Sequence, residues 1–335
     1  SQGVGSKKTN KPKFKNRYGY TFHGGGNMKR ISVQALVKTT EQLVLVVVAM
    51  AAIACQKQNS AMSSTASSTL QITTQQLGAD SARIVNGVPV ANVDPVAAST
   101  VALYLELKQS ASEPANLIGF CSGTLIAKDI VLTAAHCFVD VAKELQMSVE
   151  QVRDLTQVAF GLPVITKGLS AEGVQLRHVQ QVKVHAGYYV GAVNKAEKEA
   201  MQDIALIRME QDAPEGYVPV PVSTDKDFLK KGQTLTLAGY GVTNGFLHPR
   251  PKQLMKVDVK VDNPHLTETQ FTYRVEQGHS SCSGDSGGPA YVNTPKGLMV
   301  VGLTSWGDTS CTQIGAYTST AAMSDWMSQA ISEMH

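Results

Sequence analysis

The sequence contains no apolar run of the roughly 20 residues that a membrane-spanning helix requires. Its most apolar run, residues 43–54, has only twelve residues. No internal repeat is visible. With 43% hydrophobic and 17% charged residues, the composition excludes a collagen, a coiled coil and a wholly disordered chain. The length of 335 residues favours about two domains and is enough to bury a sizeable core.

Acidic residues are absent from residues 1–27, which carry six lysines and arginines. The net charge of the whole chain is only +3, so the chain from Ile84 onward is acidic. An acidic body does not favour nucleic-acid binding. Met28 fits a natural start residue, and we expect residues 1–27 to be an upstream extension or artefact. The alternative is a basic arm that binds nucleic acid.

The apolar run at residues 43–54 has the length of the central region of a secretory signal peptide. Lys29 and Arg30 lie upstream of it, and Cys55 follows directly. The last residues, Ala-Ile-Ala-Cys, resemble a bacterial lipobox, in which the cysteine sulfur takes a diacylglyceryl group. We expect a signal peptide at residues 28–54 and lipidation of Cys55. Ordinary signal cleavage and a retained anchor are the alternatives.

The amino-acid composition of the chain changes at Ile84. Residues 55–83 are rich in Ser, Thr and Gln and bury too little apolar surface to fold, so we expect a disordered propeptide. From Ile84 onward, short runs of Val, Ile, Leu and Thr alternate with Gly, Pro and Asn, which predicts a β-sandwich or β-barrel. The expected strands lie at residues 100–107, 123–132, 174–185, 234–239, 253–261 and 298–304. Helices are expected at residues 141–154 and 321–334.

Three separate motifs carry a candidate active site. Leu-Thr-Ala-Ala-His-Cys contains His136, Asp-Ile-Ala-Leu begins with Asp203, and Gly-Asp-Ser-Gly-Gly-Pro contains Ser286. Each motif alone has a structural interpretation, such as a turn cap or a tight loop. In the order His, Asp, Ser they resemble the chymotrypsin-like (trypsin-fold) serine proteases, over residues 84–335.

This resemblance implies an all-β fold of two packed six-stranded antiparallel β-barrels with a C-terminal α-helix. The first barrel would span about residues 84–222, the second about 223–320, and the helix about 321–334. It implies a serine endopeptidase, a hydrolase that acts on protein or peptide substrates, is monomeric and uses no cofactor.

The chemistry of the three residues agrees with that activity. A serine hydroxyl is a weak nucleophile at neutral pH and needs an adjacent base. We expect Ser286 to be the nucleophile, His136 the base and Asp203 the buried carboxylate that orients the imidazole. The resemblance implies that the N–H groups of Gly284 and Ser286 form the oxyanion hole.

The segment Arg83-Ile84-Val85-Asn86-Gly87 resembles the activation junction of the family. Cleavage after Arg83 would free the amine of Ile84, which by resemblance pairs with Asp285. A buried carboxylate without its partner is strongly destabilised, so we expect the uncut chain to be an inactive zymogen. The alternative is that Ile84 and Val85 simply begin a strand.

Five cysteines are present. The resemblance implies disulfides between Cys121 and Cys137 and between Cys282 and Cys311, which would indicate an oxidising compartment. Cys55 is the one cysteine not assigned to a disulfide, which agrees with its expected lipidation. We therefore expect an exported, membrane-anchored lipoprotein zymogen, or a secreted or periplasmic one, whose activated domain is released.

The resemblance also implies a substrate pocket beside the nucleophile. Its floor would be Ser280, six residues before Ser286, and its other residues Ser281, Ser305, Trp306, Gly307 and Gly315. An uncharged floor does not compensate a buried cation, so we expect cleavage after Phe, Tyr, Leu or Met, and activation by a separate trypsin-like protease. Elastase-like specificity is one alternative, and trypsin-like specificity through Asp308 is another.

The sequence does not indicate a metal site. The histidines at 178, 248 and 265 lack paired ligand spacing, and residues 174–180 lack the acids of a calcium loop. His185 and Tyr188 fit a structural strand and turn. The competing hypotheses are a non-catalytic binding protein with the protease fold, and a surface protein that acts through its tether or through residues 141–154.

Overall fold

The computed structural model describes residues 84–107, 116–165, 171–189, 194–241, 253–282, 284–308 and 310–335. Arg83, Cys55, the expected signal peptide and the expected propeptide lie outside the described residues. Within these ranges, no helix has both the length and the apolar character to cross a bilayer.

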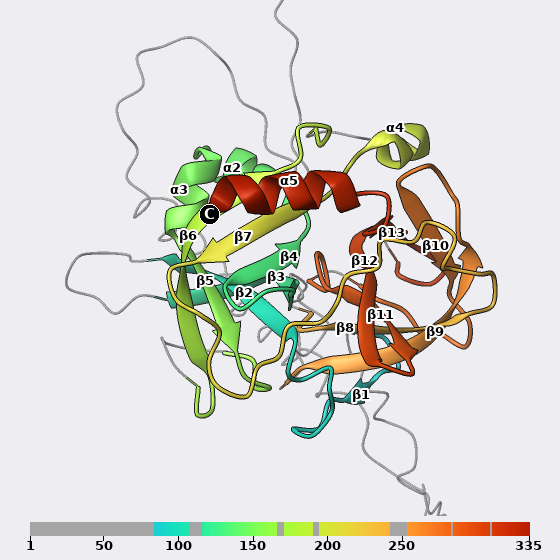
Figure 1. Cartoon of the computed structure of the whole chain (residues 1–335), viewed down its shortest axis with the longest axis horizontal. Helices are drawn as coiled ribbons and strands as arrows, with labels where there is room; N and C mark the ends of the chain where they lie inside the picture. Colours follow the sequence, from blue (N-terminus) through green and yellow to red (C-terminus); the bar gives the residue numbers. More distant parts are fainter. Residues whose placement is uncertain are drawn as a thin grey trace, which may run out of the picture. The chain divides into compact units, whose positions relative to one another are not determined.

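Six strands of the first half form a closed antiparallel barrel in the order β2-β3-β4-β7-β6-β5 (Figure 1). They are β2 (Thr100–Leu107), β3 (Asn116–Leu125), β4 (Ile130–Thr133), β5 (Thr156–Phe160), β6 (Gln175–Val184) and β7 (Ala205–Met209). The pairing of β2 with β5 closes the barrel. All four residues of β4 and all five of β5 are buried, which agrees with the apolar run Ile-Val-Leu in β4 and Val-Ala-Phe in β5.

The strands of the second half, together with β1 from the first described residues, form a sheet in the order β1-β9-β10-β13-β12-β11-β8. Its strands are β1 (Val88–Pro89), β8 (Thr234–Gly239), β9 (Met255–Asn263), β10 (Gln270–Arg274), β11 (Pro289–Thr294), β12 (Gly297–Gly307) and β13 (Ile314–Ser319). Because β8 also pairs with β9, six of these strands close into a second barrel, and β1 is added beside β9. The two six-stranded barrels confirm the expected fold class.

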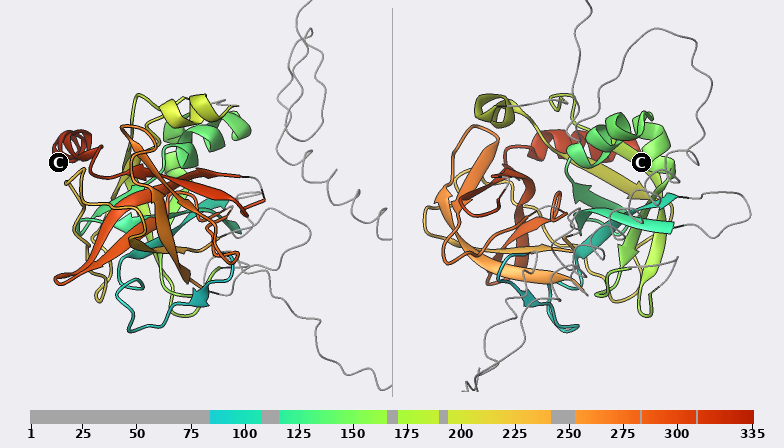
Figure 2. Two further views of the ribbon diagram at one scale, coloured as in Figure 1. Left: turned by 90° about the vertical axis from the view of Figure 1, so that its right-hand side faces the viewer. Right: turned by 180° about the vertical axis from the view of Figure 1, so that it is seen from behind.

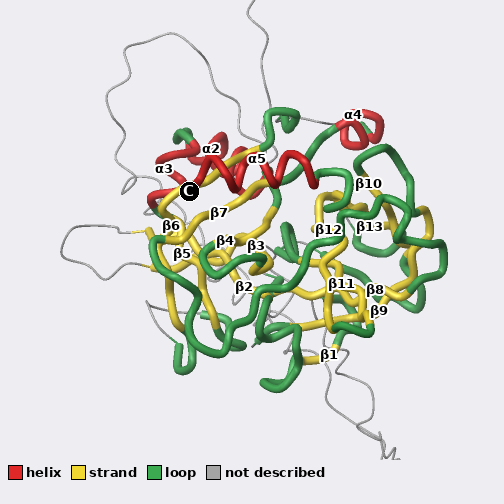
Figure 3. Tube along the Cα trace, in the orientation of Figure 1, coloured by secondary structure: helices red, strands yellow, loops and turns green. Residues whose placement is uncertain are grey.

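Helices cover one side of the first barrel (Figures 1 and 3). They are α2 (His136–Leu145), α3 (Val149–Asp154) and α5 (Ser324–Met334); a further short helix is α4 (Lys195–Ala200). The C-terminal helix α5 follows the second barrel in sequence, but its buried residues Met327, Ala330 and Met334 join the core of the first barrel. Figure 2 shows α2, α3 and α5 from two further sides.

Two buried tyrosines connect the barrels. The hydroxyl of Tyr240 donates to the carbonyl oxygens of Gly161 at 2.6 Å and Thr100 at 3.3 Å. The hydroxyl of Tyr291 lies 2.9 Å from Ser99 Oγ and 3.0 Å from Thr100 Oγ1. Because a buried hydroxyl without a partner is destabilising, these bonds fix how the two barrels face each other.

The first described residues belong to the second barrel. Val85 and Ser280 exchange backbone hydrogen bonds of 2.7 and 3.3 Å, and β1 pairs with β9. Ile84 is fully buried in the apolar core of that barrel. The segment 84–90, expected in the first barrel, therefore crosses to the second barrel before the chain enters β2.

Two expected elements are each divided in the structure. The strand expected at residues 123–132 is divided into β3 and β4, because Ile126–Ile130 form a turn whose Asp129 pairs with Arg208 on β7 at 3.1 Å. The helix expected at residues 141–154 is two helices. Gln146 ends α2 with a left-handed φ of 57°, and Ser148 begins α3 with a capping box to Gln151.

Candidate active site

Strand pairing brings His136 and Asp203 together. His136 is the first residue of α2, directly after β4, and Asp203 lies just before β7. Thr133, the last residue of β4, is the register partner of Ala205, the first residue of β7. The two side chains therefore emerge at the same end of neighbouring strands of the first barrel.

The Asp203 carboxylate is buried, and His136 contacts both of its oxygens. The backbone N–H of His136 donates to Oδ1 at 3.0 Å, and His136 Nδ1 lies 2.8 Å from Oδ2. The side chain of Asp203 is 2% exposed, whereas that of His136 is 18% exposed. A proton on Nδ1 that donates to Asp203 leaves Nε2 as the basic nitrogen of the ring.

Ser305 is a second partner of this carboxylate. Its hydroxyl donates to Asp203 Oδ2 at 2.6 Å. Ser305 was expected only as a residue of the substrate pocket, because nothing local in the sequence indicates that β12 passes behind Asp203. The bond ties the second barrel to the His136–Asp203 pair of the first.

Asp140 adds a further negative charge near His136. Burial by itself lowers the pKa of His136, but the Asp203 and Asp140 carboxylates together raise it above its ordinary value of about 6.5. The Tyr188 hydroxyl donates to Asp140 Oδ1 at 2.8 Å. Asp140 lies four residues after His136 on α2, a spacing that places both on one helix face. That signal was missed because the expected helix began at residue 141.

The Ser286 loop packs against the end of β4. Ser286 O accepts a hydrogen bond from Ser122 N at 2.8 Å. Gly287 has a φ of 74°, and a Cβ there would lie 2.2 Å from Thr133 Oγ1 and 2.9 Å from Ala134 N. Only glycine allows this approach, which brings Ser286 close to the segment that carries His136. Gly284, expected in the oxyanion hole, also has a left-handed φ of 91°.

Two disulfides flank these segments, and they are the pairs that the resemblance implied. Cys121 and Cys137 have their Cα atoms 6.2 Å apart, and Cys282 and Cys311 have theirs 5.5 Å apart. Cys121, His136 and Cys137 are the one group of potential metal ligands found in the described part of the chain. Because both sulfurs are in the disulfide, this group does not provide a metal site.

Asp285 is fully buried and directly precedes Ser286 in the chain. Its Oδ2 accepts from Cys282 N at 2.9 Å and its Oδ1 from Gly241 N at 3.1 Å. Gly239 has no room for a Cβ, which would lie 2.3 Å from Asp285 Oδ1. The carboxylate is therefore held in a tight backbone cage of the second barrel.

The residues of the expected pocket come from three segments that the second barrel brings together. Ser280 and Ser281 are buried, and Gly307 is the register partner of Gly315. Trp306 Nε1 donates to Gln270 Oε1 at 3.0 Å. Gln270 in turn donates to the carbonyl oxygens of Lys198 and Met201 at 2.8 and 3.2 Å, and so connects Trp306 to the α4 segment.

Asp308, the acid next to Gly307, is directed into its own loop. It accepts hydrogen bonds from Ser310 Oγ and from the N–H groups of Thr312, Gln313 and Ile314, at 2.5 to 3.1 Å. Partial burial raises its pKa, but these donors outweigh burial and hold the pKa well below the ordinary range. Its charge is therefore satisfied by the loop, which argues against a role in binding a substrate cation.

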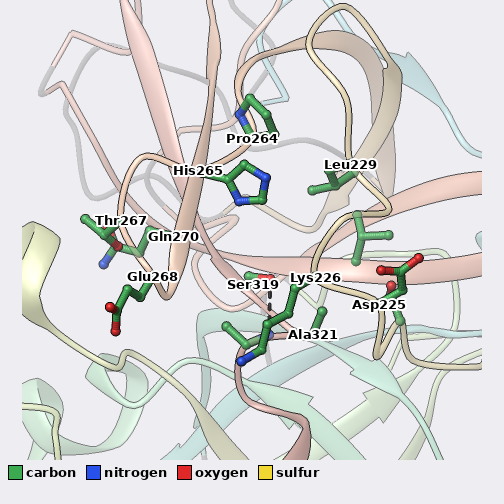
Figure 4. Close-up of a pocket in the computed structure, with 13 residues that line it drawn as sticks. Asp225, Lys226, Leu229, Pro264, His265, Thr267, Glu268, Gln270, Ser319 and Ala321 are labelled. Carbon is green, nitrogen blue, oxygen red and sulfur yellow. Dashed lines mark hydrogen bonds between the residues drawn. The ribbon is translucent and has the colours of Figure 1, made fainter.

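A second pocket lies elsewhere on the second barrel (Figure 4). Lys226, His265, Glu268 and Ser319 are among the residues that line it. None of His136, Asp203 and Ser286 borders it.

The comparisons agree with this geometry. The family model described as Trypsin matches residues 104–327, more than half of the chain. The chain is 28% identical to a tryptase of Mus musculus over 62% of this chain and 77% of the relative. It is 26% identical to trypsin epsilon of Drosophila erecta over 64% of this chain and 79% of the relative. The chain therefore belongs to the trypsin family and is a serine endopeptidase.

Proposed function

We propose that this endopeptidase hydrolyses peptide bonds with Ser286 as nucleophile, His136 as general base and Asp203 as the orienting carboxylate. The observation that carries the proposal is the pair of hydrogen bonds from His136 to Asp203, at 3.0 and 2.8 Å. They hold the ring with Nδ1 toward the buried carboxylate, so Nε2 is the nitrogen available to a nucleophile.

The reaction follows from this arrangement. His136 Nε2 takes the proton of the Ser286 hydroxyl as its oxygen attacks the peptide carbonyl carbon. The N–H groups of Gly284 and Ser286 stabilise the oxyanion. His136 then gives its proton to the leaving amine, and water, activated by the same nitrogen, releases the acyl group from Ser286. The buried Asp203 stabilises the imidazolium that forms between these steps.

Covalent labelling tests the assignment. The full chain, cut by immobilised trypsin, is treated with a fluorophosphonate probe, and the modified residue is identified by mass spectrometry. We expect labelling of Ser286, and loss of labelling and hydrolysis in Ser286→Ala. Ser310→Ala, an exposed serine on the neighbouring loop, is the control and should keep both. Hydrolysis that persists in Ser286→Ala would refute the assignment.

The same proposal includes activation by cleavage after Arg83. Its support is the burial of Ile84 in the core of the second barrel and the pairing of Val85 with Ser280, close to the cage around Asp285. A new amine at Ile84 would add a positive charge beside a carboxylate that is out of water. The charge pair would order the loop that presents Gly284 and Ser286.

The pocket is proposed to be uncharged. Ser280 and Ser281 supply hydroxyl groups, and Asp308 is engaged by its own loop. A lysine or arginine side chain would lose its hydration there without gaining a partner. The enzyme is therefore a poor catalyst of its own cleavage at Arg83, and a separate trypsin-like protease is required.

Export and anchoring form the last part of the proposal. The two disulfides account for four of the five cysteines and indicate an oxidising compartment. Cys55 is the fifth, and we propose that it carries a lipid which holds the zymogen on a membrane until cleavage after Arg83 releases the enzyme. Release into the soluble fraction after trypsin treatment supports this, and retention of the cut enzyme on membranes in high salt contradicts it.

A further inference from the structure

The floor of the expected pocket carries a further side chain, that of Tyr273. Tyr273 on β10 is the register partner of Gly315 on β13, so the two residues lie directly opposite each other. The two strands are neighbours in the second barrel (Figure 1). A Cβ added at Gly315 would lie 2.3 Å from Cε1 of Tyr273, 2.5 Å from Cζ and 2.6 Å from the hydroxyl oxygen. The outer end of the phenol therefore occupies the space that Gly315 leaves open.

Hydrogen bonds fix the phenol in this place. The Tyr273 hydroxyl lies 3.0 Å from Ser280 Oγ and 3.0 Å from Ser281 Oγ, and it accepts from Ser281 N at 2.8 Å. Tyr273 is fully buried, and Ser280 and Ser281 are 1% and 8% exposed. The polar groups of the expected floor are thus engaged with the protein itself rather than directed at a substrate.

We infer that Tyr273 determines specificity by forming the floor of the pocket and making it shallow. The enzyme then accepts small uncharged side chains, such as Ala, Ser or Val, before the cleaved bond and rejects Phe and Tyr. A ring anchored by three hydrogen bonds does not move aside for a second ring, and overpacking a buried site is unfavourable. This inference rests on the proposed function of Ser286, and it replaces the expected cleavage after Phe, Tyr, Leu or Met.

The wild-type enzyme provides the first test. The full chain is cut with immobilised trypsin, and N-terminal sequencing verifies cleavage after Arg83. Peptides that differ only in the residue before the cut (Ala, Val, Leu, Phe or Arg) are compared. We expect kcat/KM for Ala to exceed that for Phe at least about tenfold. A labelled enzyme that prefers Phe overturns the inference and leaves the proposed function intact. A cut chain with neither labelling nor hydrolysis refutes the proposed function, and the inference with it.

Variants test the role of Tyr273 itself. Tyr273→Leu removes Cζ and the hydroxyl, which contact Gly315, but keeps an apolar side chain in the core. We expect the ratio of kcat/KM for Phe to that for Ala to rise about tenfold, and to rise further in Tyr273→Ala. Tyr273→Phe keeps the ring but removes the hydroxyl that anchors it, so the ratio should rise less than in Tyr273→Leu.

Phe271→Ala is the matched control. Phe271 is another fully buried aromatic residue of β10, but its ring packs against Gly302 on β12 and not against Gly315. Its loss should lower stability without changing the Phe-to-Ala ratio. An unchanged ratio in a Tyr273→Leu enzyme that the fluorophosphonate still labels would overturn the inference. A Tyr273→Ala chain that does not fold leaves the wild-type panel and the Leu variant as the deciding measurements.

Discussion

Asp203 accepts two hydrogen bonds from His136. The backbone N–H of His136 donates to Oδ1, and the ring Nδ1 donates to Oδ2. The same oxygen, Oδ2, also accepts a hydrogen bond from the Ser305 hydroxyl at 2.6 Å. The carboxylate is thus satisfied by three donors in a site where it is 2% exposed. A buried charge is tolerated when every oxygen has partners, and here these partners come from both barrels.

Replacing Asp203 by Asn tests the orienting role. The amide group would present a donor to His136 Nδ1 and shift the ring proton to Nε2, where the base is needed. We expect kcat to fall by about 10³ to 10⁴-fold with little change in KM. Steady-state kinetics on the trypsin-cut full chain measures both kcat and KM. Asp154→Asn, at an exposed site where Asp154 pairs with the neighbouring Arg153, is the control. A loss smaller than tenfold would contradict the role.

The pH profile should reflect both acids near His136. Activity requires the neutral imidazole, so kcat/KM falls as the pH drops through the pKa of His136, which Asp203 and Asp140 raise above about 6.5. Asp140→Asn removes one of the two negative charges and lowers that pKa, so the acid limb moves to lower pH. Tyr188→Phe removes a hydrogen bond to Asp140 but leaves its charge, and it should shift the limb less. A shift to higher pH in Asp140→Asn would be inconsistent with this account.

Arg83→Gln should keep the chain a zymogen. Trypsin treatment should activate the wild-type chain by freeing Ile84, whereas the variant offers no basic residue at that position. We expect fluorophosphonate labelling of Ser286 to be at least about a hundredfold slower in the variant, because the oxyanion-hole donors are not ordered. Equal labelling of uncut and cut protein would show that the buried position of Ile84 alone is sufficient.

Gly287→Ala should abolish activity through the backbone. The added Cβ would meet Thr133 Oγ1 at 2.2 Å and backbone atoms of Ser122 and Ala134 within 3 Å, so the Ser286 loop must move. Gly297→Ala is a matched control, because Gly297 also has a positive φ, of 108°, but no atom lies within 4 Å of the added Cβ. Both variants should lose about 1 kcal/mol or more of unfolding free energy, but only Gly287→Ala should lose hydrolysis.

Asp308→Asn should affect stability and leave the choice of substrate unchanged. The variant loses a charged acceptor of four hydrogen bonds in the loop that carries Cys311, and we expect a loss of about 1–3 kcal/mol at neutral pH. The pKa of Asp308 is depressed on folding, so its contribution is complete above the unfolded value of about 3.9 and is lost as the pH falls toward the folded value. The difference in unfolding free energy between the wild type and the variant should therefore become smaller at acidic pH. A change in cleavage after Arg or Lys would restore trypsin-like specificity as an explanation.

Much of the architecture follows from local patterns in the chain. Short apolar runs separated by glycine and turn residues predict the strands, and β2 and β8 have the expected bounds. Element ends were less predictable. The division of residues 123–132 depends on the pairing of Asp129 with Arg208, a residue far away in sequence. Gln146 interrupts the helical segment by adopting a left-handed conformation that is uncommon for a residue other than glycine.

The sequence by itself determined the candidate chemistry, because His136, Asp203 and Ser286 lie in motifs whose composition and order are informative without any coordinates. Only the tertiary structure decided what surrounds them. Ser305 reaches Asp203, and Tyr273 fills the space beside Gly315, because strands of the second barrel bring together residues that are distant along the chain. A glycine in a sequence indicates that a side chain is missing, whereas the fold decides whether a substrate or a neighbouring residue occupies that space.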